Sequence, residues 1–184
     1  MALRRIVLKG DEILTKKCKP VKEITPRVIE LMNDMVETMA ENDGVGLAAP
    51  QVGVMKRLFV ARPFPDAEDP EMDKIYFMIN PEILDTRGEQ ESTEGCLSYP
   101  DFMGYVDRPQ AIKIKAQDLD GEWHTYEFED YAAVVMCHEN DHLDGILYTD
   151  KAKEIITVDE FTERIEAERA AMEDDLAEEE DKQE

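Results

Sequence analysis

The run DYAAVVMCHENDHLDG, residues 130–145, dictates how the rest of this chain must be arranged. Its first half, from Tyr131 to Met136, is apolar on every side at helical spacing, which is typical of a buried helix. Asp130 can cap the start of this helix, and Gly145 supplies a residue that ends it. We therefore expect the helix to lie at the centre of the molecule, with the other elements packed around it.

The second half of the helix carries His138, Glu139 and His142 in the pattern H-E-x-x-H. Two histidines four residues apart project from one face of an α-helix, so both imidazoles can bind the same metal ion. The alternative is a pair of ordinary core or solvent-facing histidines, but unpaired imidazoles are costly to bury beside so apolar a run. The pattern therefore favours a metal-dependent hydrolase with Glu139 as the general base.

An open catalytic metal site needs a third protein ligand and leaves one position for water. Metalloproteases with this pattern usually take that ligand from downstream, as His or Glu. In this chain no His follows His142, and the downstream candidates are Asp144, Asp150, Asp159 and Glu160. Upstream, Cys96 lies in the sequence EGCLS, residues 94–98, beside a glycine. A thiolate in such a loop can reach the metal, so Cys96 is the predicted third ligand.

The other two cysteines suit a metal less well. Cys18 lies in the charged run KKCKP and is interpreted as an incidental or semi-exposed thiol. Cys137 neighbours His138, but successive residues of a helix point about 100° apart, so the two cannot easily face one ion. A small buried hydrophobe is the better interpretation of Cys137. Three cysteines without an export signal also make a disulfide framework unexpected.

Two further helices are predicted around the central one. Thr25 and Pro26 form the N-cap and first position of an amphipathic helix over about residues 26–42. A capping-box pattern opens a last helix near residue 157. The residues that define this last helix are the cap pair Thr157 and Glu160, the apolar face Phe161, Ile165 and Met172, and the outer pair Glu160 and Arg164.

Strand patterns fill much of the remaining chain. Leu58–Ala61 and Ile75–Ile79 are β-rich, and the acidic segment 62–74 between them, with its prolines, is expected to be a surface loop. Residues 111–117 alternate apolar and polar side chains, and Asp120-Gly121 then marks a turn into a return strand. The fold class predicted is α+β, with mostly antiparallel sheets around the central buried helix and a C-terminal helix.

Length and charge limit the function classes. The 184 residues suit one domain, predicted over residues 1–172, followed by an acidic, frayed tail over residues 173–184. A formal net charge of −23 disfavours direct binding to nucleic acid or to anionic membranes. Neither a signal peptide nor a membrane span is recognisable, so a cytoplasmic protein, expected to be a monomer, is predicted.

Three separated motifs resemble those of the peptide deformylases, in the order that this family uses. GVGLAAPQ, residues 44–51, is similar to the family's glycine-rich first motif, EGCLS to its second, and HENDH, residues 138–142, to its third. The resemblance extends to about residue 170, and the three motifs together are far more specific than any one of them. The chain departs from the family pattern at Cys137, where Gln is common, and at Asn140, where an apolar residue is common.

The resemblance implies a metal-dependent hydrolase that removes the formyl group from the N-terminal formyl-methionine of newly made polypeptides and releases formate. It implies one divalent ion, most commonly Fe²⁺ in this family, with Zn²⁺, Ni²⁺ or Co²⁺ able to occupy the site. Glu139 would act as general base and then acid, while the side-chain amide of Gln51 and the backbone N–H of Leu97 would stabilise the oxyanion. The metal ligands implied are Cys96, His138 and His142.

The substrate pocket implied is apolar and sized for an unbranched thioether side chain. Gly46 and Val45 of the first motif are expected to bind substrate. Tyr131 and Val134 lie one or two turns before His138 on nearly the same face and are the other candidates. For each apolar residue, ordinary core packing is an equally open interpretation.

Three charged residues are expected to support the site. Arg108 would pair with Glu94 and hold the loop that carries Cys96, although a simple surface charge is the alternative. Asp141 would orient an imidazole or else face water.

Three other functions stay open from the sequence. A zinc endopeptidase is disfavoured by the upstream cysteine and the missing downstream ligand. A noncatalytic binding module or structural metal site would have no need of both Glu139 and Gln51. The third is a deformylase that acts on a formylated compound other than nascent protein, and the sequence hardly distinguishes this function from the main prediction.

Overall fold

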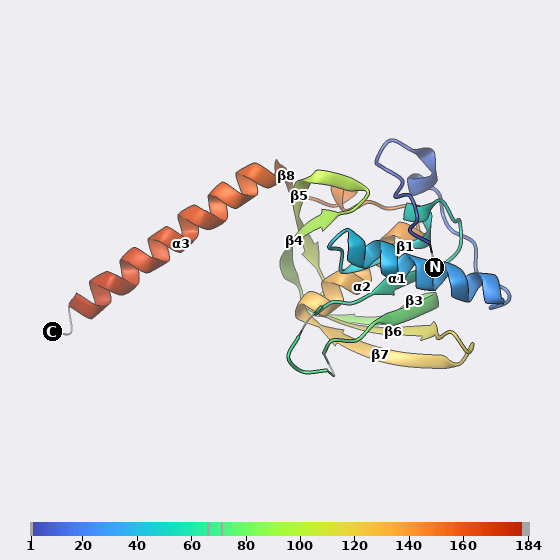
Figure 1. Ribbon diagram of the computed structural model, residues 1–184. Helices are drawn as coiled ribbons and strands as arrows, with labels where there is room; N and C mark the ends of the chain where they lie inside the picture. The colour runs from blue at the N-terminus through green and yellow to red at the C-terminus, as the bar shows by residue number, and fades with distance from the viewer. Residues whose placement is uncertain (1, 66, 71, 182–184) are drawn as a thin grey trace.

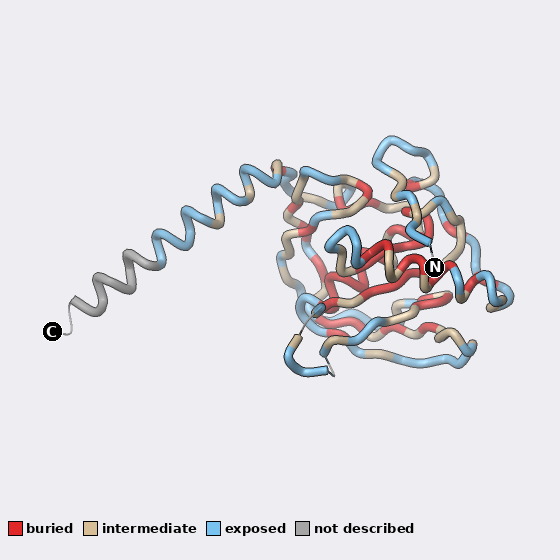
Figure 2. Tube along the Cα trace, viewed as in Figure 1, coloured by how far each residue is buried: buried red, intermediate tan, exposed pale blue. Residues whose placement is uncertain are grey.

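The computed structural model describes residues 2–65, 67–70 and 72–181. Helix α2, Asp130–Leu143, runs through the interior, and each residue from Ala132 to Glu139 is buried. Figure 2 shows this helix as the buried centre of the molecule. The long apolar run has the environment expected of it, because a helix that is hydrophobic on all sides must be covered on all sides.

The start of α2 differs from the prediction. Asp130 is the first residue of the helix and not its cap, while Glu129 stands at the N-cap position and makes no side-chain capping bond. The preceding strand runs directly into the helix, so the sharp change of direction falls on Asp130, which has a φ of 49°. The helix ends before Gly145, whose φ of 74° lies in the left-handed region that glycine adopts readily.

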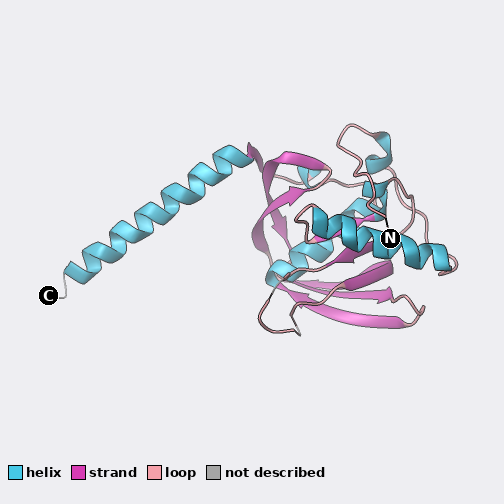
Figure 3. Cartoon of the chain, in the orientation of Figure 1, coloured by secondary structure: helices cyan, strands magenta, loops and turns pink. Residues whose placement is uncertain are grey.

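Among the described residues, eight strands form two sheets in which the strands pair antiparallel. The first sheet has the order β1-β2-β3-β6-β7 and the second the order β4-β5-β8 (Figures 1 and 3). The strand bounds are β1 Gly46–Ala48, β2 Leu58–Ala61, β3 Tyr76–Arg87, β4 Gln90–Cys96, β5 Tyr99–Arg108, β6 Ala111–Gln117, β7 Trp123–Glu129 and β8 Glu154–Thr157.

The first sheet lies between two helices at its β1–β3 end. Alternate residues of β2 point to opposite faces, so Phe59 packs in the cluster around α2 while Leu58 and Val60 pack in the cluster around α1, Pro26–Glu41. Burial on both faces explains why LFVA is a continuous apolar run. The α+β fold class and the helix predicted over residues 26–42 are therefore confirmed.

The last helix, α3, Val158–Asp181, extends away from the two sheets (Figure 1). The predicted capping box is present, because the Glu160 N–H donates to Thr157 Oγ1 and the Thr157 N–H donates to Glu160 Oε2. The predicted pair of Glu160 with Arg164 is wrong: Arg164 binds Glu154 of β8 at 2.8 Å, since the Glu160 carboxylate is engaged by the cap.

The domain boundary at residue 172 and the fraying beyond it stay predictions, and residues 182–184 of the predicted tail lie outside the described residues. In the part of the chain that is described, no helix combines the length and the apolar character that a membrane span requires.

Two smaller expectations also need correction. Cys18 is buried and not semi-exposed, because its backbone N–H donates to the Leu143 carbonyl at 2.8 Å and its side chain packs in the cluster around α2. Burial raises the pKa of its thiol to about 11. The strand expected at Ile75–Ile79 continues to Arg87, well beyond the apolar residues that predicted it.

Candidate metal centre

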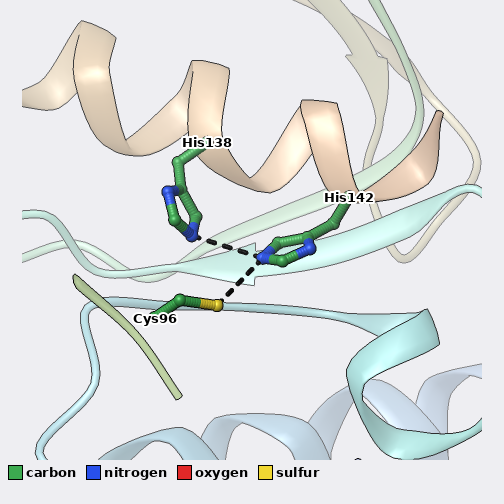
Figure 4. Close-up of side chains that lie close together, drawn as sticks. All are labelled: Cys96, His138 and His142. Carbon is green, nitrogen blue, oxygen red and sulfur yellow. Dashed lines mark hydrogen bonds between the residues drawn. The ribbon is translucent and has the colours of Figure 1, made fainter. Parts of the chain in front are cut away.

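The three predicted ligands come together from two elements. Cys96 is the last residue of β4, and His138 and His142 project from one face of α2 (Figure 4). Cys96 Sγ lies 3.3 Å from His142 Nε2, and that nitrogen lies 3.2 Å from His138 Nε2. A tetrahedral ion bonded at the usual lengths to nitrogen and sulfur holds its ligand atoms about 3.3–3.6 Å apart. The donor atoms and their spacing therefore fit a divalent metal ion.

A buried carboxylate fixes the orientation of the first histidine. His138 Nδ1 lies 2.8 Å from Glu94 Oε2, which leaves Nε2 free to face the other two ligands. Burial opposes ionisation of Glu94, but hydrogen bonds from Arg108 and His138 together outweigh it and lower the pKa of this carboxyl to about 2. Glu94 is therefore an anion that accepts the Nδ1 proton.

The pair predicted between Arg108 and Glu94 is present and buried. The Arg108 guanidinium donates from Nε and Nη2 to the two Glu94 oxygens at 2.6 and 2.8 Å. Asp141 neither orients an imidazole nor merely faces water, because its carboxylate accepts from Arg108 and from Lys151. The imidazole-orienting residue is Glu94 instead, a contact across 44 positions of sequence that has no local pattern.

Glu139 is buried between the predicted metal ligands and the first motif. Its Oε2 has no hydrogen-bond partner among the described residues, and burial raises its pKa to about 7. A Cβ added at Gly46 would overlap the Glu139 carboxylate, and one added at Gly44 would lie 2.8 Å from the Leu97 side chain. These two neighbours explain why glycine, which has no side chain, stands at both positions.

The Gln51 side chain has one defined orientation. Gln51 lies in the 3-10 helix Ala49–Val52, and its Oε1 accepts the Ala48 N–H at 2.7 Å. Nε2 therefore faces the other way, where it donates to Ser98 Oγ at 3.2 Å and lies 3.4 Å from Cys96 Sγ. Ser98 was not singled out from the sequence, because a serine in a short polar loop carries no distinctive pattern.

A cavity of about 1110 Å³ opens beside this cluster. Its lining includes four residues of the site, Glu139, Gln51, Cys96 and His138, but not His142. Leu97 also lines the cavity. So do the four residues expected to bind substrate, which are Val45, Gly46, Tyr131 and Val134.

Comparisons with known proteins agree with these motifs. The family model described as "Polypeptide deformylase" matches residues 3–157. The peptide deformylase of Acetivibrio thermocellus is 48% identical over 169 residues, which cover 92% of this chain and 95% of that protein. The peptide deformylase of Lachnoclostridium phytofermentans is 46% identical over 167 residues, with coverage of 89% and 99%.

Solved structures give the same result. A crystal structure of peptide deformylase from Thermotoga maritima has a TM-score of 0.78 and 39% identity, covering 84% of this chain and all of that one. A structure of the Acinetobacter baumannii enzyme bound to Met-Ala-Ser has a TM-score of 0.76 and 34% identity, with coverage of 82% and 98%. The chain therefore belongs to the polypeptide deformylase family, the hydrolases that remove the N-terminal formyl group from newly made polypeptides.

Proposed function

We propose that Cys96, His138 and His142 hold one divalent ion, which is Fe²⁺ in the cell and can be replaced by Zn²⁺, Ni²⁺ or Co²⁺. The observation that carries the proposal is the convergence of one thiol and two imidazole nitrogens, with neighbouring donors 3.2 and 3.3 Å apart. A thiolate beside two imidazoles is a softer ligand set than imidazoles alone and suits iron as well as zinc. Bound there, a divalent ion activates water for attack on a carbonyl carbon at neutral pH.

Glu139 is the proposed proton carrier. Its carboxylate lines the cavity, follows a ligand directly in sequence, and has an oxygen with no hydrogen-bond partner among the described residues. That oxygen is available to take a proton from the attacking water. Glu139 then gives the proton to the leaving amine, which releases formate and a free N-terminus.

The Gln51 amide and the backbone N–H of Leu97 are the proposed donors to the oxyanion. The Ala48 N–H holds the Gln51 oxygen, so the amide nitrogen is the end beside Cys96 and the cavity. Leu97 follows Cys96 and lines the same cavity. Preorganised donors of this kind contribute about 3 kcal/mol each to transition-state stabilisation.

Gly46 is proposed to bind substrate and, on the evidence of its packing, to make room for the base. Gly46→Ala should lower kcat about 100-fold, because the new methyl group must displace the Glu139 carboxylate and a displacement of about 1 Å has an effect of that size. Bound metal, measured by elemental analysis, should stay at the wild-type level. Gly121→Ala is the control for a general loss of stability, because its φ of 85° strains any residue with a Cβ while no backbone atom lies close to the new methyl group; it should keep the wild-type kcat. Wild-type kcat in Gly46→Ala would contradict this role.

Val45, Tyr131 and Val134 are proposed to form the wall of the pocket for the methionine side chain. Val134→Trp should raise the KM for formyl-Met-Ala-Ser by about tenfold, since the larger side chain fills space that the thioether needs. A formyl-Gly peptide should be affected much less. Leu84→Trp, at a half-exposed site on β3, serves as the control. An unchanged KM would remove Val134 from the pocket.

The proposed substrates are formyl-methionyl nascent polypeptides, and the proposed setting is the cytoplasm, where the protein acts as a monomer without binding nucleic acid directly. The net charge of −23 supports the last point, because such a field repels phosphate backbones.

The decisive experiment is formate release from formyl-Met-Ala-Ser by protein prepared anaerobically with Fe²⁺, compared with protein loaded with Zn²⁺ or Ni²⁺. Acetyl-Met-Ala-Ser is the control substrate. Formate from the formyl peptide alone, with most activity per bound Fe²⁺ and rapid loss of activity in air, supports the proposal. Stoichiometric metal without formate would overturn the substrate assignment and point to another formylated compound.

A further inference from the structure

The N-terminal segment, residues 2–9, is an extended chain that links α1 to the metal centre, and we refer to it as the strap. Four of its backbone N–H groups donate to residues outside the strap, at distances between 2.7 and 2.9 Å. Two of these bonds go to α1 and two to the segments that bear the proposed oxyanion donors. The bonds are Ala2 to Asp34 Oδ1, Arg4 to Thr38 Oγ1, Val7 to the Gln51 carbonyl and Lys9 to the Ser98 carbonyl.

The α1 end of the strap is held by two buried polar side chains. Asp34 and Thr38 are 2% and 1% exposed, one helical turn apart on a face that is otherwise apolar. Besides accepting the Ala2 N–H, Asp34 binds the Arg4 guanidinium at 2.7 and 2.9 Å. Because burying a polar group is costly unless it is hydrogen-bonded, the strap accounts for the presence of both residues in the core.

The other end of the strap is bonded to the two sides of the proposed oxyanion hole. Val7 binds the backbone of Gln51, and Lys9 binds the backbone of Ser98, the residue after Leu97. Ser98 Oγ also accepts from Gln51 Nε2, so the two attachment points are themselves joined. Ile6 and Leu8, which alternate with the bonded residues, line the cavity. The strap therefore contacts both proposed donor segments and the space for substrate.

We infer that the strap positions the oxyanion donors, and that Thr38 and Asp34 of α1 are positioning residues that act through it. The inference rests on the proposed roles of Gln51 and Leu97. Thr38 anchors the Arg4 backbone, and the extended chain carries that constraint to Val7 and Lys9. Since donor placement affects the transition state more than the bound substrate, loosening the anchor changes kcat rather than KM.

The test compares Thr38→Val, which keeps the shape but removes the hydroxyl acceptor, with Thr38→Ser, which keeps the hydroxyl. Thr38→Val should lower kcat for formyl-Met-Ala-Ser about three- to tenfold with KM changed less than twofold. Metal content should equal that of the wild type. Thr38→Ser should retain kcat within twofold. Hydrogen exchange of the Val7 and Lys9 amides should be faster in Thr38→Val than in Thr38→Ser.

Two further variants separate an effect of the strap from a general loss of stability and from an error in the proposed oxyanion hole. Val28→Ala opens a cavity in the core on the same helix and should lower the melting temperature without lowering kcat. Equal kcat in Thr38→Val and Thr38→Ser would overturn the inference, as would an equal loss of kcat in Val28→Ala. If the inference fails, Gln51→Ala identifies which proposal is wrong. If Gln51→Ala has the wild-type kcat, the oxyanion role of Gln51 is wrong. If Gln51→Ala has a lower kcat, only the role of the strap is wrong.

Discussion

Glu139→Gln should reduce kcat/KM for formyl-Met-Ala-Ser by about 10²- to 10⁴-fold, the usual contribution of a general acid–base residue. Glutamine preserves the size of the buried side chain and its contact with Gly46, but its amide cannot take a proton from water and pass it to the amine. The three proposed ligands are unchanged, so the variant should bind one metal ion per chain. The measurement is formate release, with metal content determined on the same sample.

Glu163→Gln on α3 makes the same chemical change at an exposed position and should have wild-type activity. Loss of activity in Glu139→Gln together with loss of metal would show that the residue supports the site and not the proton transfer. Wild-type activity with full metal content would show that another group moves the proton.

Arg108→Met should destabilise the protein by about 3–5 kcal/mol, because it leaves the Glu94 anion buried without its cationic partner. The side chains of Arg108 and Glu94 are 2% and 3% exposed, so water does not replace the lost guanidinium. Asp141 loses one of its two cationic partners in the same change. The free energy of unfolding is measured in urea, with the metal content of variant and wild type matched.

The chain offers a control with the same chemistry at the surface. Arg164 binds both oxygens of Glu154, but the two side chains are 45% and 50% exposed. Arg164→Met should therefore change the free energy of unfolding far less than Arg108→Met does. Similar losses in the two variants would show that burial is not the cause. Glu94→Gln added to Arg108→Met should recover part of the stability, since it removes the unpaired charge.

Regular, buried elements are the part of this fold that the sequence predicts well. The helices α1 and α2 and the hairpin of β6 and β7 have unbroken helical or alternating patterns, and each is found close to its predicted position. The sheet of β4, β5 and β8 was not predicted, because β4, QESTEGC, has no alternating apolar residues. Its strands form by pairing with one another, and long-range pairing leaves little trace in local composition.

In the candidate site too, local patterns were predicted and long-range contacts were not. The cluster of Cys96, His138 and His142 was predicted from the H-E-x-x-H spacing and the family resemblance, and the structure brings the three together. The bond from His138 to Glu94 and the bonds of the strap were not predicted, since they join residues 30 to 89 positions apart. Family membership also rejects the zinc endopeptidase and the noncatalytic scaffold that the sequence left open.

The shape of α3 affects how the size of this protein is measured. A helix of 24 residues is about 36 Å long, comparable to the diameter of a small domain. Because it extends from one side of the molecule (Figure 1), it raises the frictional coefficient above that of a sphere with the same mass. A monomer of 21.1 kDa should therefore elute early from a gel-filtration column and resemble a larger species. Light scattering, which reports mass independently of shape, gives the number of chains per particle directly.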